Sequence, residues 1–211
     1  MSGQLPWYVA RSAGLISWAL LTASVLWGLA LSGRTMRKWA KPSWILDLHR
    51  FLGGLTIVFV LVHVSALLLD TYVHFGLVQL LMPLATSWHP LGVAWGITGL
   101  YLLAAVEVTS LLRGRLRRKV WKRTHYATLP LFVVATAHGF NTGTDRANMA
   151  VIFIGVAGVV AVAFLGCRRL ARKTSVMPAA RKATPRLSAT EDREHPQNGR
   201  SYVDDLLVTA D

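Results

Sequence analysis

The sequence is poor in charged residues and in cysteine. Only 16% of its 211 residues are charged and 53% are hydrophobic, with a mean hydropathy of +0.42. Soluble domains carry about 25% charged residues, so a soluble globular fold is not expected from this composition. The single cysteine, Cys167, excludes an intrachain disulfide and a zinc site built from cysteines.

Negative charge is also scarce, because 23 Lys and Arg stand against 10 Asp and Glu and leave a net charge of +13. Such an excess can indicate nucleic-acid binding. Here the basic residues form short blocks between apolar stretches instead of one continuous basic face. The composition therefore predicts a protein of the lipid bilayer that does not bind nucleic acid.

What the sequence does contain is a series of long apolar runs. A helix needs about 20 mainly apolar residues to cross a bilayer. The sequence predicts five such spans, although the fourth is short by count: residues 12–32, 48–70, 91–112, 126–141 and 149–167. We therefore expect an all-α bundle of five transmembrane helices within residues 1–167, followed by a disordered cytoplasmic tail over 168–211.

The basic blocks predict the orientation of these spans. They lie at 34–41, 113–123 and 168–173, and Lys and Arg next to spans stay on the cytoplasmic side. The loop 71–90 contains no Lys or Arg, as an external loop should. The pattern predicts a multi-pass protein of the inner (cytoplasmic) membrane, with its N-terminus outside and its C-terminus in the cytoplasm.

Histidines lie in or beside two of the predicted spans. His49 and His63 are fourteen residues apart, and His125 and His138 are thirteen apart. Each separation corresponds to a rise of about 20 Å along a helix. Because both spans run outward, His49 and His125 are expected at an inner level, and His63 and His138 at an outer level. Ionisable residues inside a span are costly and are usually functional.

Neutral imidazole is a good axial ligand for heme iron, and helix bundles often hold a cofactor between facing side chains. If the two spans face each other, the sequence predicts two stacked bis-histidine sites. On an ideal helix, however, His125 and His138 point about 140° apart. We expect Pro130, which lies between them, to kink or overwind the helix and so correct their directions.

Two motifs resemble the ferric reductase-like transmembrane domain. They are HRFLGG at 49–54, followed by His63, and WKRTH at 121–125, followed by His138. That family includes ferric reductases, NADPH oxidases and the heme subunit of the periplasmic methionine sulfoxide reductase system. The resemblance covers residues 45–167 and implies two b-type hemes, with iron held by His49 and His125 at the inner site and by His63 and His138 at the outer site.

The expected function is that of an oxidoreductase subunit. Arginine binds carboxylates in a bidentate manner, so Arg50 and Arg123 are candidate partners for heme propionates. No glycine-rich dinucleotide fingerprint follows the last span, and we expect no FAD or NADPH site in this chain. Electrons would then come from a cytoplasmic flavoprotein or a membrane quinol, and would pass to an extracytoplasmic acceptor or reductase.

A function of another class also remains open at this point. A heme-free membrane transporter or scaffold would use His63 and His138 to bind protons or metal ions inside the membrane. The two alternatives differ in colour, because only a cytochrome shows a Soret band.

Overall fold

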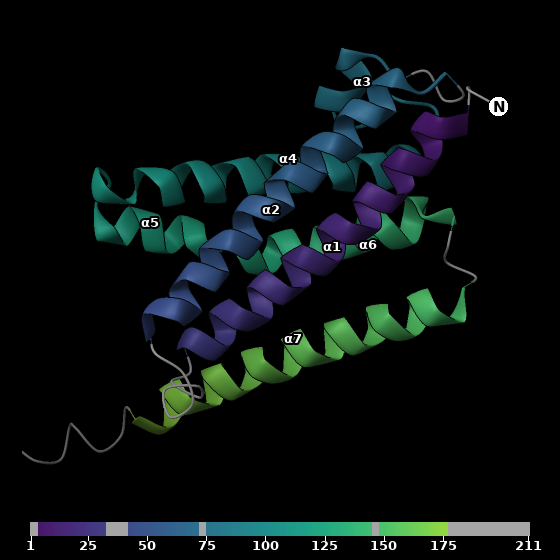
Figure 1. Ribbon diagram of the computed structural model, residues 1–211. Helices are drawn as coiled ribbons and strands as arrows, with labels where there is room; N and C mark the ends of the chain where they lie inside the picture. The colour runs from purple at the N-terminus through teal and green to yellow at the C-terminus, as the bar shows by residue number, and fades with distance from the viewer. Residues whose placement is uncertain (1–3, 33–41, 72–74, 145–147, 177–211) are drawn as a thin grey trace, which may run out of the picture. The chain divides into compact units, whose positions relative to one another are not determined.

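The computed structural model of the chain describes residues 4–32, 42–71, 75–144 and 148–176, and within these ranges it is all-helical (Figure 1). The α-helices are α1 (Leu5–Ser32), α2 (Pro42–Leu69), α3 (Leu77–Leu81), α4 (Pro90–Leu111), α5 (Arg118–His125), α6 (Thr128–Thr142) and α7 (Met149–Val176). A short 3₁₀ helix, η2 (Leu112–Gly114), follows α4. The predicted tail begins inside α7, and its residues 177–211 lie outside the described residues.

Among the described residues, four helices are long and apolar enough to cross a membrane, over Leu5–Leu31, Ser43–Leu69, Pro90–Gly114 and Met149–Ala171. They correspond to the first, second, third and fifth predicted spans. The fourth predicted span is covered by α6, which has 15 residues. At 1.5 Å per residue α6 is about 22 Å long, which is less than the hydrocarbon core of about 30 Å. The chain is thus a multi-pass, all-α membrane protein.

The helix is interrupted between α5 and α6, by a turn at Tyr126 and Ala127. The amide of Ala127 donates a hydrogen bond to the carbonyl of Thr124 (2.9 Å), which is the tighter spacing of a 3₁₀ turn. Pro130 falls in the first turn of α6, where its missing N–H group costs nothing. Pro130 was expected to kink or overwind the helix between the two histidines; the structure has an overwound 3₁₀ turn at Tyr126 and Ala127, which interrupts the helix just before Pro130.

The break has a direct consequence for the histidines. His125 is the last residue of α5, whereas His138 lies in the second half of α6. Their relative directions are set by the turn at Tyr126 and Ala127 and not by the ideal helical angle between residues thirteen apart.

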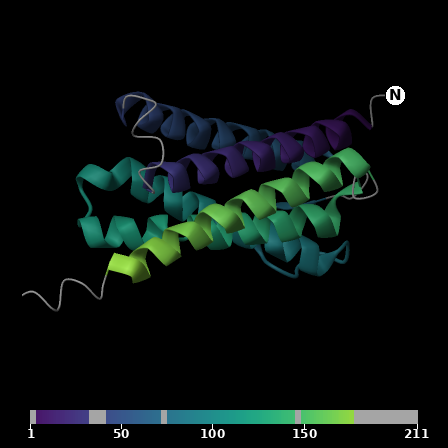
Figure 2. The ribbon, with the colours of Figure 1, turned by 90° about the horizontal axis from the view of Figure 1, so that it is seen from below.

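The helices pack mainly in two pairs, α1 with α2 and α4 with α6, and α1 also contacts α6. Both views show α1 and α2 lying side by side, antiparallel to each other (Figures 1 and 2). A buried apolar cluster joins α1, α4, α6 and α7 and consists of Leu21, Val25, Leu29, Leu103, Leu131, Phe132 and Val162.

The cluster lies at mid-depth in the bundle. Leu131 and Phe132 are midway between His125 and His138 in the sequence, and both are buried. Trp18 of α1 stacks on Phe132, with ring centroids 6.4 Å apart, and its Nε1–H donates a hydrogen bond to Thr136 Oγ1 (3.0 Å). The apolar layer therefore separates the inner and outer histidine levels.

Leu131→Ala should lower the midpoint of thermal unfolding in detergent, because it leaves a cavity in this cluster. A buried leucine replaced by alanine typically costs about 2–5 kcal/mol. Leu129→Ala is the matched control, since Leu129 lies on the same helix and is 39% exposed, against 3% for Leu131. Equal midpoints for the two variants, measured by size-exclusion chromatography after heating, would contradict the packing described.

Candidate functional site

The outer histidine pair consists of His63 on α2 and His138 on α6. Their ring centroids are 6.3 Å apart and the ring planes are inclined by 81°. His63 Nδ1 lies 2.7 Å from the carbonyl oxygen of Ala10, and His138 Nδ1 lies 2.8 Å from that of Gly92. A carbonyl oxygen only accepts hydrogen bonds, so each Nδ1 carries the proton. Nε2 of each ring is then free to bind a metal.

The inner pair, His49 on α2 and His125 on α5, has nearly the same geometry. The ring centroids are 6.0 Å apart and the planes are again inclined by 81°. His49 Nδ1 lies 3.1 Å from the carbonyl oxygen of Ser24. His125 Nδ1 is buried and finds no hydrogen-bond partner among the described residues. The ring of His125 is stacked instead on Trp121, with centroids 5.2 Å apart and planes inclined by 21°.

Three of the four imidazoles rest on a glycine of a neighbouring helix. A methyl group built on each glycine would lie 2.7–3.2 Å from the ring, and the contacts are Gly14 with His63, Gly28 with His49 and Gly96 with His138. In each case the carbonyl that accepts the Nδ1 hydrogen bond belongs to the residue four positions before the glycine.

The geometry of the α-helix explains this arrangement. Side chains tilt toward the N-terminus, so each residue covers the turn that precedes it. A glycine therefore leaves the carbonyl one turn earlier exposed on the helix surface. We call each such glycine, together with that carbonyl, a glycine socket: Ala10 with Gly14, Ser24 with Gly28, and Gly92 with Gly96. Each socket seats one imidazole and selects its tautomer.

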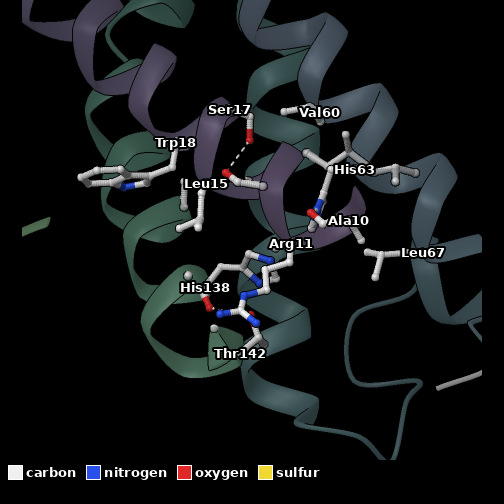
Figure 3. Close-up of a pocket in the computed structure, with 18 of the residues that line it drawn as sticks. Ala10, Arg11, Leu15, Ser17, Trp18, Val60, His63, Leu67, His138 and Thr142 are labelled. Carbon is white, nitrogen blue, oxygen red and sulfur yellow. Dashed lines mark hydrogen bonds between the residues drawn. The ribbon is translucent and has the colours of Figure 1, made fainter. Parts of the chain in front are cut away.

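The outer pair borders a cavity of about 280 Å³. Most of its lining is apolar and aromatic, with Trp7, Phe75 and Trp88 among the larger side chains. Arg11 of α1 also lines it, and Figure 3 shows this side chain reaching toward His138 and Thr142. An apolar cavity with a few polar groups is typical of cofactor sites, which commonly begin at about 300 Å³.

The two pairs fit a metal ion held between their rings. An imidazole nitrogen binds a metal at about 2 Å and lies about 1 Å from the ring centre, so two such rings on opposite sides of one ion have centroids about 6 Å apart. The measured separations of 6.0 and 6.3 Å match this value. Each pair offers two imidazoles, which is the number of axial ligands that a porphyrin iron can bind.

Two cationic side chains, Arg113 and Arg169, lie near His125 of the inner pair. The guanidinium of Arg113 lies 4.7 Å from the ring centre of Trp121. Burial, followed by His49 and the positive charges of Arg113 and Arg169, lowers the pKa of His125, which lies outside the candidate spans. The neutral form that can bind a metal is thereby favoured. Arg50 and Arg123 are exposed, and Arg50 lies 3.7 Å from Asp47; their binding to propionates stays a prediction.

The structure thus brings the four histidines together in two pairs, whereas their role as iron ligands stays a prediction. The sequence analysis missed the glycine sockets, Arg11, and the stacking of Trp121. One signal was available: Gly14 and Gly28 are fourteen residues apart, as are His49 and His63. Equal spacings on two antiparallel helices indicate two matched contacts.

One comparison with known proteins found a match. The family described as "Ferric reductase like transmembrane component" matches residues 13–136, which is more than half of the 211 residues. The matched segment contains the three socket glycines, His49, His63 and His125, and it ends just before His138. No curated protein and no solved structure matches the chain. Domains of this kind generally bind heme and transfer electrons within a membrane. This chain belongs to the ferric reductase-like transmembrane component family.

Proposed function

We propose that this protein is a transmembrane b-type cytochrome that carries two hemes, one at each histidine level. The observation that best supports this proposal is that two histidine pairs, with the same interplanar angle and nearly the same ring separation, lie at the two levels. His49 and His125 would hold the inner iron, and His63 and His138 the outer iron. Their separation along α2 corresponds to a rise of about 21 Å.

The chain's own residues hold and orient the ligands. Each socket accepts a hydrogen bond from the Nδ1–H group of one imidazole, which fixes the tautomer and leaves Nε2 as the nitrogen that would bind iron. When bound, heme supplies the one-electron chemistry. The apolar layer around Leu131 and Phe132 excludes water between the two levels.

Cations near each level would pair with the heme propionates. On the outer side this is Arg11, which lines the cavity. On the inner side Arg113 joins Arg50 and Arg123, because Arg113 lies against the stacked rings of the site. Arginine suits this role because its planar fork matches a carboxylate.

Electrons would pass outward, from a cytoplasmic flavoprotein or a membrane quinol to an extracytoplasmic acceptor or reductase. The proposed topology has five spans in the inner membrane, with the N-terminus outside and the C-terminus in the cytoplasm, so the inner heme would face the donor and the outer heme the acceptor. The basic helix α5 and the η2 segment beside it support a cytoplasmic location for the inner site. In this topology α6 supplies the fourth crossing.

Reporter fusions test the topology. A fluorescent protein that folds only in the cytoplasm should be bright when fused at Gly114 or after Val176, and dark when fused after Met82. The reason is that basic segments are retained on the cytoplasmic side. Fluorescence at all three positions would contradict the five-span arrangement.

Purified protein should contain two hemes per chain and show a Soret band with a reducible α-band. The ferric form should be low-spin and should give a highly anisotropic electron paramagnetic resonance (spin-resonance) signal. Such a signal is expected from two perpendicular axial imidazoles, and the rings of both pairs are inclined by 81°. Heme content from the pyridine hemochrome and the spin-resonance spectrum are the measurements. A colourless, folded protein from heme-replete cells would instead favour the heme-free transporter or scaffold.

Single histidine variants should separate the two sites. His63→Ala and His138→Ala should each remove the outer heme and leave the inner signal, and His49→Ala and His125→Ala should do the reverse. The expected heme content is thus about half of the wild-type value, since each heme depends on both of its ligands. Loss of the same heme from the His49 and His63 variants would contradict the pairing.

Gly96→Ala should weaken the outer heme, because a Cβ there would lie 2.7 Å from His138 Nδ1 and the ring would have to move. Changes in groups that orient a metal ligand typically cost about 10- to 100-fold in affinity. Gly139→Ala is the matched control, since a Cβ at Gly139, next to His138 in the chain, meets nothing within 4 Å. The rate of heme transfer to apomyoglobin measures both variants, and equal rates would contradict the socket.

A further inference from the structure

Trp121 is in an unusual position beside the inner pair. Its indole lies nearly parallel to the imidazole of His125, with ring centroids 5.2 Å apart and planes inclined by 21°. The guanidinium of Arg113 covers the indole at 4.7 Å from its ring centre. His125 in turn meets His49 edge-on, with centroids 6.0 Å apart. A continuous stack therefore runs from the basic η2 segment to the inner pair.

His125 differs from the other three histidines of the two pairs in the groups that fix its ring. His49, His63 and His138 each place Nδ1 against a carbonyl oxygen of a glycine socket. For His125, Nδ1 is buried and finds no such partner within the described part of the chain. A histidine that ligates a metal almost always has its second nitrogen fixed by a hydrogen bond. The contact with Trp121 is what remains to orient this ring.

Trp121 has an unpaired polar group in this position, which is energetically unfavourable. Its Nε1–H group is buried and has no hydrogen-bond partner among the described residues, which is uncommon for a buried N–H group. The indole therefore lies where its face, and not its N–H group, makes the specific contacts. The indole ring makes both of these contacts, with the Arg113 cation and with the His125 ring.

We propose that Trp121 is the positioning residue of the inner heme. It takes the place of the missing socket by holding His125 through ring stacking, and the Arg113 cation packs on the indole as a clamp. This inference rests on the proposed two-heme function. It assigns Trp121 a role that acts through His125, without contact between the indole and iron.

The central experiment compares Trp121→Leu with Trp121→Phe in the purified, full-length protein. Trp121→Leu removes the aromatic face and should speed loss of the inner heme to apomyoglobin by about tenfold, the lower end of the effect of losing an orienting partner. Its inner spin-resonance signal should broaden or shift, because the ring of His125 is no longer held at one angle. Trp121→Phe keeps an aromatic face and should retain the wild-type signal and rate.

The outer heme of the same molecules is the internal control for folding. Its signal, assigned with His49→Ala, should be unchanged in Trp121→Leu, whereas a misfolded bundle would lose both hemes. Trp95→Leu is a matched control elsewhere, since Trp95 is a 44% exposed tryptophan on α4.

The outcomes separate this inference from the proposed function. If the wild-type protein holds no heme, the proposed function fails. If it holds two hemes and Trp121→Leu leaves the inner signal and rate unchanged, only the role of Trp121 is overturned. Equal damage by Trp121→Leu and Trp121→Phe would also overturn it, because the effect would not depend on an aromatic face.

Discussion

A hydrogen bond between an imidazole Nδ1 and a helix carbonyl is the interaction on which this structure depends. It is made at Ala10, Ser24 and Gly92, and each time a glycine one turn later leaves the carbonyl accessible. An unpaired polar group is expensive inside a bilayer, so the bond gives a buried histidine a defined place. Glycine costs about 1 kcal/mol relative to alanine in a helix, and here that cost has a specific structural reason.

The same bonds explain why the helices pack in pairs. The sockets on α1 seat both histidines of α2, and the socket on α4 seats His138 of α6. Each helix pair thus presents imidazoles in fixed orientations to the other pair. The pair of α1 and α2 presents them at two depths. The layer of Leu21, Leu131 and Phe132 fills the space between the two levels. The bundle core and the histidine sites are therefore parts of one arrangement.

The inner and outer levels differ in their surroundings. Both outer histidines are hydrogen-bonded to carbonyls and face an apolar cavity, whereas the inner level has one hydrogen-bonded histidine and one stacked on Trp121. Cationic side chains, Arg113 and Arg169, lie near His125. Hydrogen bonding to axial ligands and nearby charge are two of the means by which a protein tunes a heme. Two hemes bound here would not be equivalent.

The sequence by itself determined the membrane character, the places of the four long spans, the family and the spacing of the histidines. These are properties of composition and of position along a helix, because a span needs a long apolar run whatever its neighbours are. The sequence also showed that the apolar run of the fourth span, which α6 covers, is short. The turn at Tyr126 and Ala127 was not, since a proline in a first helical turn looks like a proline that kinks a longer helix.

Only the tertiary structure decided which groups hold each imidazole. Ala10 and His63 are 53 residues apart, and Gly92 and His138 are 46 apart, so the matched spacing of two glycines and two histidines could not show which carbonyl of one helix meets which ring of another. The stack of Arg113, Trp121 and His125 likewise requires the chain to turn back after η2. Contacts of this kind depend on how helices lie against each other, and side-chain directions across an interface are not encoded by spacing within one helix.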